Sequence, residues 1–302
     1  MSQDIISKIY SLKKQHNAII LAHNYQPDEV QDIADFVGDS LGLSQMAAKT
    51  DAEVVVFCGV LFMAEVAKIL SPDKKVIMPD IHAGCPMANM ITLEQLKELK
   101  AKHTGAVTVC YINTNSDVKT ECDICCTSGN ALKVVASIPK EKEIIFVPDQ
   151  YLGSWIEEQL DRKMILWNGY CHIHMQILPE FIVEAMKKHP EAEVLVHPEC
   201  TPAVRKMADK VLGTGGMIKW AKESSSAEFI IGTENGMIHR LQKENPSKKF
   251  YAVSDDIICP NMKKITLEKV LFSLEDLKEE IIVPLDIAAK AKKCIDAMLA
   301  LS

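Results

Sequence analysis

The chain has 302 residues, of which 48% are hydrophobic and 25% are charged, and its formal net charge is −7. This composition is typical of a globular protein with a substantial core, and it excludes a disordered chain. Nucleic acid and anionic membranes both require a concentrated cationic surface. An acidic chain without a block of Lys and Arg therefore argues against both as partners.

The first residues lack the basic and apolar segments of a secretory signal, and no apolar run reaches the roughly 18 residues needed to span a bilayer. We therefore expect a cytoplasmic protein. Cytoplasmic thiols stay reduced, so a disulfide framework is not expected from the ten cysteines. Each cysteine is then a small buried residue, a redox group or a metal ligand.

Short β-branched runs alternate with amphipathic segments along the chain, a pattern typical of an α/β protein with parallel sheets. Nine strands are predicted, at residues 18–22, 54–58, 76–78, 107–111, 143–147, 163–166, 194–197, 228–232 and 250–253. Clear helical periodicity is present at residues 61–70, 150–160 and 237–243.

A seven-residue pattern occurs three times along the chain: a small residue, Asp, any residue, a small apolar residue, two variable positions and a hydroxyl. The copies end at Ser40, Ser128 and Thr214, which are 88 and then 86 residues apart. The residues predicted to close the first strand of each copy, His23, Tyr111 and His197, have the same separations. Such self-similarity indicates an internal repeat.

The repeat predicts three pseudo-threefold-related units, each a three-layer αβα arrangement with a short parallel sheet, around a central cavity. We place the units at residues 1–84, 85–170 and 171–259, with the segment 260–302 packing back on the first unit. Ligands of open parallel sheets bind beyond the carboxyl ends of the strands. Equivalent strand ends from all three units should therefore share one site.

One set of cysteines is close to equivalent in the three copies: Cys85, Cys171 and Cys259, spaced 86 and 88 residues apart. Three thiolates from three directions can hold a [4Fe–4S] cluster and leave one iron open as a Lewis acid for a substrate oxygen. Zinc with three thiolates and a water is the competing metal. The residues alone leave both metals open.

The remaining cysteines are interpreted as structural. The segment Cys122-x-x-Cys125-Cys126 resembles a redox or metal motif. The other copies carry Ala and Val at the positions of Cys122 and Cys125, which favours a packing role. Four further cysteines are interpreted as core or surface thiols: Cys58, Cys110, Cys200 and Cys294.

Seven stretches together resemble the quinolinate synthase family along essentially the whole chain. They are ILAHNYQ at 20–26, QDIADFVGDS at 31–40, FMAE at 62–65, CPMAN at 85–89, YIN at 111–113, GYCHIH at 169–174 and HPEC at 197–200. Each stretch is a weak signal alone, but seven in the same order are specific.

The resemblance implies an oxygen-sensitive transferase-type enzyme that condenses iminosuccinate with dihydroxyacetone phosphate. The products would be quinolinate, phosphate and water, in the biosynthesis of NAD. The resemblance also implies a [4Fe–4S] cluster on Cys85, Cys171 and Cys259, with one open iron. The expected partners are these two small molecules, with a possible transient hand-off of the imine from an aspartate-oxidising enzyme.

The resemblance further implies which side chains form the site. Catalytic roles fall to Tyr25, Tyr111, His174, His197 and Glu199, because condensation and cyclisation need several proton transfers. Substrate-binding roles fall to His23, Ser40, Met63, Asn113, Ser128 and Thr214. The three hydroxyls are expected at helix starts, where free N–H groups bind carboxylate or phosphate. Many relatives have Ser where this chain has Gly213, so one hydroxyl contact is missing here.

Three alternatives remain open. Another three-cysteine iron–sulfur enzyme, such as a diphthamide-type radical enzyme or a reductive dehydroxylase of isoprenoid synthesis, would share the cluster but not the other site residues. A non-catalytic iron–sulfur carrier or sensor would need no acid/base groups. A metal-free aldolase would need a Schiff-base Lys, and no Lys falls at a register-matched strand end, so we rank it last.

Overall fold

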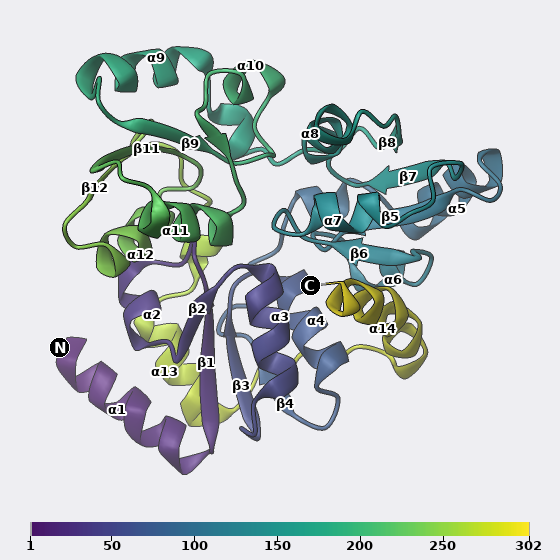
Figure 1. The fold of residues 1–302 in the computed structure, drawn as a ribbon. Helices are drawn as coiled ribbons and strands as arrows, with labels where there is room; N and C mark the ends of the chain where they lie inside the picture. Colours follow the sequence, from purple (N-terminus) through teal and green to yellow (C-terminus); the bar gives the residue numbers. More distant parts are fainter. Residues whose placement is uncertain (1, 302) are drawn as a thin grey trace.

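The computed structural model describes residues 2–301, which form three sheets of four parallel strands, each flanked by helices (Figure 1). All three sheets have the same strand order. It is β2-β1-β3-β4 in the first, β6-β5-β7-β8 in the second and β10-β9-β11-β12 in the third. The predicted α/β class with three αβα repeats is therefore confirmed.

The first sheet has two central strands that are apolar along their length, as expected for strands buried on both faces. Its strands are β1 (Ala18–His23), β2 (Phe36–Gly38), β3 (Val54–Cys58) and β4 (Lys75–Ile77). Its helices are α1 (Ser2–Gln15), α2 (Asp28–Ile33), α3 (Ser40–Lys49) and α4 (Leu61–Leu70). Helices α3 and α4 pack against each other and on strands β1 and β4.

The second sheet follows the same plan. Its strands are β5 (Val107–Tyr111), β6 (Ile124–Cys126), β7 (Ile144–Val147) and β8 (Ile165–Leu166). Its helices are η1 (Met87–Asn89), α5 (Leu93–Lys102), α6 (Ser116–Lys119), α7 (Ala131–Ala136) and α8 (Gln150–Leu160). Helix α5 begins at a capping box between Thr92 and Gln95, which satisfies N–H groups at its first turn.

The third sheet repeats the plan once more. Its strands are β9 (Glu193–Val196), β10 (Lys210–Val211), β11 (Glu228–Gly232) and β12 (Lys249–Ala252). Its helices are η2 (His174–Gln176), α9 (Pro179–Lys188), α10 (Pro202–Arg205), α11 (Thr214–Glu223) and α12 (Met237–Glu244). Helix α9 packs on β11, and α12 packs on β12.

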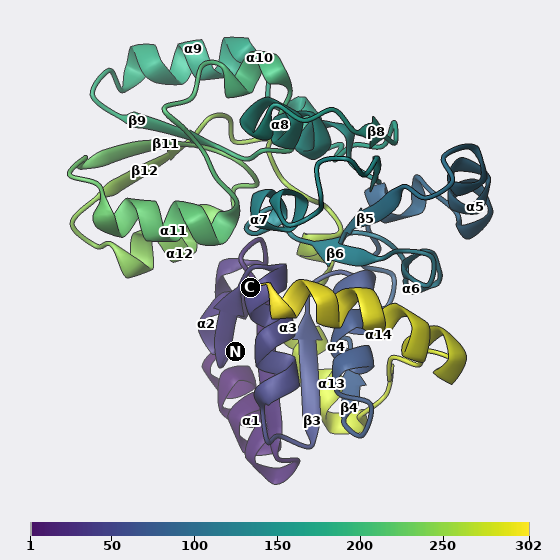
Figure 2. The same cartoon turned by 45° about the vertical axis from the view of Figure 1, so that its right-hand side comes forward.

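The C-terminal segment contains η3 (Met262–Lys264), α13 (Leu267–Asp276) and α14 (Leu285–Ala300). Helix α13 contacts α1 and β3 of the first unit, where the sequence places the whole segment. Helix α14 instead contacts β6 and α6 of the second unit as well as α4 (Figure 2). The exact unit boundaries stay a prediction, and each sheet lies within one predicted unit.

All nine predicted strands are present, with ends that differ by two residues or fewer, and the sheets contain three more: β2, β6 and β10. These three strands have three, three and two residues. A run this short cannot display the alternation that marks a strand. All three lie inside the repeated seven-residue pattern.

The Asp of the seven-residue pattern makes the same two hydrogen bonds in every unit. The carboxylates of Asp35, Asp123 and Asp209 accept the N–H of Ile20, Thr108 and Val194 at 2.8, 2.7 and 2.8 Å. The N–H groups of these Asp residues donate to the carbonyls of the same three partners at 2.9, 3.0 and 2.9 Å. Each Asp therefore fastens the start of the short edge strand to the first strand of its sheet.

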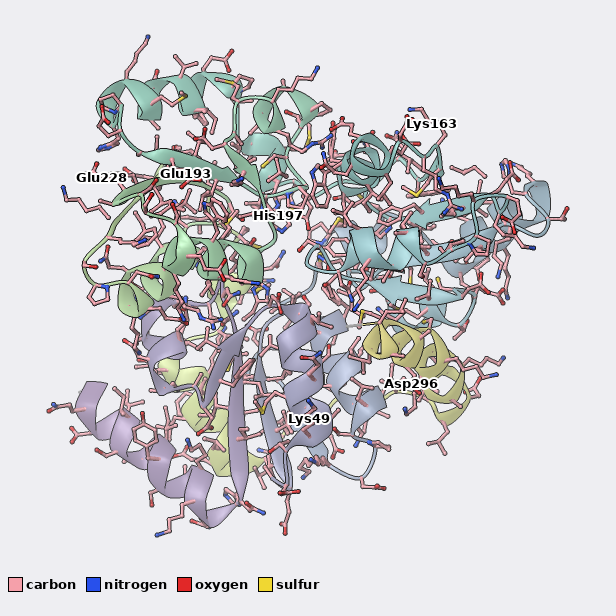
Figure 3. All side chains as sticks on the ribbon, viewed as in Figure 1. Lys49, Lys163, Glu193, His197, Glu228 and Asp296 are labelled. Atoms are coloured by element: carbon pink, nitrogen blue, oxygen red, sulfur yellow. The ribbon has the colours of Figure 1, made fainter. Side chains whose placement is uncertain are left out.

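Charged side chains cover the outside of the molecule, as for Lys49, Lys163 and Asp296 (Figure 3). The side chain of His197 lies instead in the space where the three units meet (Figure 3). Within residues 2–301, no helix combines the length and the hydrophobicity that crossing a membrane requires.

We expect Asp123→Ala to lower the free energy of unfolding by about 1 kcal/mol, because the N–H of Thr108 loses its acceptor. Urea unfolding followed by circular dichroism measures the change. Asp51→Ala is the matched control, because the structure gives this exposed carboxylate no hydrogen bond, and a change below about 0.5 kcal/mol is expected. A stability of Asp123→Ala equal to that of the control would contradict the role given to the repeated Asp.

Candidate functional site

A cavity of about 760 Å³, including its open mouth, lies at the centre of the molecule. In a sheet ordered 2-1-3-4 the chain changes direction between the first and third strands, and ligands bind at the carboxyl ends there. Those ends of all three sheets reach this cavity. All fourteen residues nominated from the sequence line its wall: His23, Tyr25, Ser40, Met63, Cys85, Tyr111, Asn113, Ser128, Cys171, His174, His197, Glu199, Thr214 and Cys259.

Two histidines occupy equivalent positions at the ends of β1 and β9. Nδ1 of His23 accepts the N–H of Tyr25 at 3.2 Å, and Nδ1 of His197 accepts the N–H of Glu199 at 3.3 Å. A ring nitrogen that accepts carries no proton, so the proton of each neutral ring lies on Nε2. Burial lowers the pKa of both histidines to about 3. Both rings are therefore neutral N–H donors at physiological pH.

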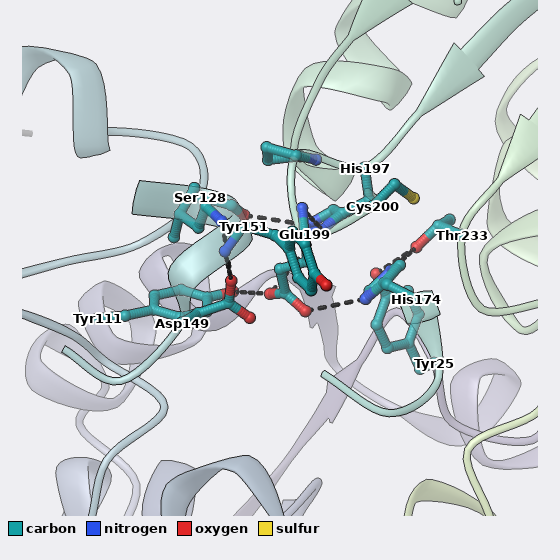
Figure 4. A network of polar contacts seen from close by, with 12 residues as sticks. Tyr25, Tyr111, Ser128, Asp149, Tyr151, His174, His197, Glu199, Cys200 and Thr233 are labelled. Atoms are coloured by element: carbon teal, nitrogen blue, oxygen red, sulfur yellow. Dashed lines mark hydrogen bonds and ion pairs between the residues drawn. The ribbon is translucent and has the colours of Figure 1, made fainter. Parts of the chain in front are cut away.

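Glu199 is the centre of a buried network that joins the second and third units (Figure 4). The hydroxyl of Tyr111 donates to its Oε1 at 2.5 Å, and Nδ1 of His174 lies 2.8 Å from its Oε2. Burial disfavours the charge of Glu199. Attraction to the His197 and His174 rings in their protonated forms, with the hydrogen bonds from His174 and Tyr111, outweighs burial and lowers its pKa to about 2. Glu199 is therefore a carboxylate.

The two tyrosines of the cavity keep their protons. Burial, followed by the negative charge of Glu199, raises the pKa of Tyr25 and of Tyr111 well above the ordinary value. The Tyr25 hydroxyl lies 2.6 Å from Oγ1 of Thr233, which also lies 2.8 Å from Nε2 of His174. Both phenols are thus positioned as hydrogen-bond donors on the cavity wall.

The hydroxyl trio differs in part from the prediction. Ser40 and Thr214 are the first residues of α3 and α11, as expected, but Ser128 lies in the turn that precedes α7. The helix-dipole argument therefore applies to two of the three. Ser128 lies instead with its Oγ 3.2 Å from Nε2 of His197. Oδ1 of Asn113 is buried without a hydrogen-bond partner among the described residues, which leaves it for a ligand.

The three predicted ligand cysteines enter the cavity in the same way. Each begins a loop that continues into a short 3-10 helix, η1 after Cys85, η2 after Cys171 and η3 after Cys259. Burial raises the pKa of Cys85 to about 12, and backbone N–H groups of the following turn act against burial. Burial also raises the pKa of Cys171 and of Cys259, and again the following turn opposes it. N–H groups aimed at sulfur are the usual surroundings of a cluster thiolate.

The three sulfurs face one cavity but do not all lie within 4.8 Å of one another. The sulfur of Cys171 does lie within that distance of His174 and Glu199, a group that could hold a metal ion. The wall of the cavity therefore carries the side chains that a metal centre requires.

The structure contains a second group of neighbouring thiols that was not predicted from the sequence. We interpreted Cys125 as packing and both Cys110 and Cys294 as core or surface thiols. The structure brings the three sulfurs within 4.8 Å of one another in a fully buried group that could hold a metal. The reason is α14, which carries Cys294 onto β6 and has no counterpart in the repeat.

Two buried carboxylates near the ligand loops were also missed. Glu234 accepts the N–H of Cys259 at 3.0 Å and pairs with Lys263 at 3.0 Å. Asp149 accepts the backbone N–H of Cys171. Asp149 and Glu234 are 85 residues apart, which is also the separation of Leu152 and Met237, two residues that follow the equivalent strands β7 and β11. Each carboxylate lies three positions before one of these residues, so comparing the copies at that position would have found both.

The chain has three αβα units around one shared cavity, which thiols and acid/base groups line. This arrangement is that of an enzyme with an interior active site. The chain belongs to the family described as quinolinate synthetase A protein, whose model matches residues 7–300. The resemblance inferred from the seven stretches is therefore confirmed, and the alternatives from other families are excluded.

The relatives span the whole chain. It is 54% identical over 300 residues to the quinolinate synthase of Dehalococcoides mccartyi strain CBDB1, covering 99% of both chains. It is 52% identical over 297 residues to that of Methanosarcina barkeri, covering 98% and 97%. It is also 54% identical over 297 residues to that of Alkaliphilus metalliredigens, covering 98% of both chains. These relatives are enzymes.

We expect the free energy of unfolding to fall as the pH drops from 6.5 towards 5. The pKa of His23 and of His197 is about 3 in the folded chain and 6.5 ordinarily, so the unfolded chain binds more protons in this range. Each histidine contributes up to about 1.4 kcal/mol per pH unit. Urea unfolding at a series of pH values measures the slope.

His197→Gln should make this pH slope shallower by up to about 1.4 kcal/mol per pH unit, which is the contribution of one proton bound only in the unfolded chain. Ser247→Ala, at an exposed position outside the cavity and without a titratable side chain, is the control and should keep the wild-type slope. An unchanged slope in His197→Gln would show that this ring is not held neutral in the folded chain.

Proposed function

We propose that the chain condenses iminosuccinate with dihydroxyacetone phosphate to give quinolinate, phosphate and two waters, in the biosynthesis of NAD. The observation that carries the proposal is that one thiol from the loop after each sheet lies on the wall of a single cavity, which also holds neutral donors and the carboxylate of Glu199. Membership of the family supports the same reaction. The unstable imine would come from an aspartate-oxidising enzyme by transient hand-off, and the reducing cytoplasm would protect the site.

Cys85, Cys171 and Cys259 would hold a [4Fe–4S] cluster. When bound, the cluster supplies one iron without a protein ligand, a Lewis acid for a substrate oxygen. Two features of the residues suit this group: the cavity that the three thiols share and the N–H groups of the three turns that follow them. The carboxylates of Asp149 and Glu234 hold two of the three ligand loops in place.

Both substrates are anions, and the acidic chain must bind them with local donors. The Nε2–H groups of His23 and His197 supply two donors without adding a charge that would need its own partner. The hydroxyls of Ser40 and Thr214 lie at helix starts, where free N–H groups bind phosphate and carboxylate. Ser128 and Asn113 would complete the contacts to the substrates.

The proton transfers fall to the residues around Glu199. Tyr25 and Tyr111 hold phenolic protons that they can give to oxygens leaving as water. Glu199 accepts a hydrogen bond from the Tyr111 hydroxyl, and it is the group that would receive a proton from a substrate carbon. His174 is fixed between Glu199 and Thr233, so its ring can pass a proton without turning. Met63 adds an apolar wall that excludes water.

Replacing any one of Cys85, Cys171 or Cys259 by Ala should abolish the brown cluster absorbance and quinolinate formation, because two thiolates do not retain the cluster. The measurement is iron and sulfide counting on anaerobically purified protein, with a quinolinate assay on the same sample.

Cys58→Ala is the matched control, because this thiol is fully buried outside the cavity. It should keep the wild-type iron content and activity. Full activity of Cys171→Ala would refute the three-thiol site, and wild-type protein free of iron but active would refute the cluster.

Glu199→Gln should keep the cluster and lower kcat by about 100-fold or more, because the amide cannot take up a proton. Steady-state kinetics and iron counting on the same preparation separate the two effects. Glu193→Gln, at the first residue of strand β9 and outside the cavity wall, is the control and should leave kcat unchanged. Turnover of Glu199→Gln at the wild-type rate would remove this carboxylate from the catalytic group.

A further inference from the structure

We propose that Cys110, Cys122, Cys125 and Cys294 form a second metal site, which binds one Zn²⁺ and fastens helix α14 to the second sheet. The site is separate from the central cavity, whose wall contains none of these four residues.

The strand register brings the first two thiols together. Cys110 in β5 and Cys125 in β6 are directly paired residues of neighbouring parallel strands, and their sulfurs lie 3.3 Å apart. Successive side chains of a strand point to opposite faces. Because Tyr111 faces the cavity, Cys110 points to the opposite side. Cys294 of α14 adds a third sulfur, 3.2 Å from that of Cys125.

Cys122 supplies the fourth ligand. Its thiol interacts with that of Cys110 and donates to the carbonyl oxygen of Val118 at 3.3 Å, and it lies outside the group of three sulfurs that are within 4.8 Å of one another. Binding of the ion would require its side chain to turn from that carbonyl towards the other three sulfurs. Four thiolates complete the tetrahedral coordination that structural zinc sites require.

The size of the group selects one ion. Zinc–sulfur bonds of about 2.3 Å place tetrahedral thiolates about 3.8 Å apart. The sulfur of Cys125 lies 3.3 Å from that of Cys110 and 3.2 Å from that of Cys294, so an ion would move these sulfurs apart by only about half an ångström. Those three sulfurs all lie within 4.8 Å of one another. Cys85, Cys171 and Cys259 do not form such a compact group, so the two sets of thiols present different geometries to a metal.

A buried ammonium group would balance part of the negative charge of the four thiolates. Lys119 at the end of α6 is fully buried, and its Nζ donates to the carbonyls of Ile112 and Thr114. Among residues 2–301 no carboxylate pairs with it, although an unpaired buried charge is costly. Its charge interacts with Cys110 and Cys294. Four thiolates and Zn²⁺ carry a charge of −2, which Lys119 reduces to −1.

The test is metal counting by mass spectrometry on wild-type protein purified anaerobically with zinc and passed over a weak chelator. About one zinc per chain is expected in addition to iron. Cys294→Ser should lose about 90% or more of the zinc and keep its iron. Cys85→Ala should lose its iron and keep its zinc. Cys58→Ser, a fully buried thiol outside both groups, is the matched control and should keep both metals.

Zinc absorption spectroscopy on the wild type keeps the test valid if Cys294→Ser fails to fold. A first shell of sulfur alone, at about 2.3 Å, is expected. A first shell with nitrogen or oxygen would overturn the proposal. Wild-type protein without zinc, or zinc retained by folded Cys294→Ser, would also overturn it.

Discussion

The direction of the strands is the constraint on which the whole molecule depends. Because the four strands of each sheet run parallel, their carboxyl ends lie on one edge, and the polar residues that follow them gather there. The three sheets share one strand order, so three equivalent edges can face one another. His23, Tyr111 and His197 meet at the centre for this reason, although more than 80 residues separate each from the next.

Side chains of the site and their immediate neighbours make some of the hydrogen bonds between the units. Tyr111 of the second unit holds Glu199 of the third, and Asn24 of the first donates to Thr214 of the third at 2.8 Å. A buried polar network stabilises only when every member is satisfied. The site therefore contributes to the docking of the units. A substitution here changes the interface as well as the chemistry.

The sequence predicted the units and the cavity wall because both follow from a repeat, and a repeat is visible as a constant offset. It did not predict β2, β6 and β10, which are too short to show any periodicity. Asp149 and Glu234 occupy equivalent positions in the second and third copies of the repeat. They were not predicted as site residues, because the first copy has Val60 at this position. The thiol group around Cys125 could not be predicted, because it depends on where the unrepeated helix α14 docks.

The position of α14 affects how the molecule is completed during synthesis. The ribosome delivers a chain from its N-terminus, and early segments begin to fold before later ones exist. One face of strand β6 is covered by a helix that starts at Leu285 and ends at Ala300. The middle of the protein therefore keeps an apolar face exposed until residues 285–300 have been synthesised. The second unit depends for its completion on a segment that the ribosome delivers more than 150 residues after β6.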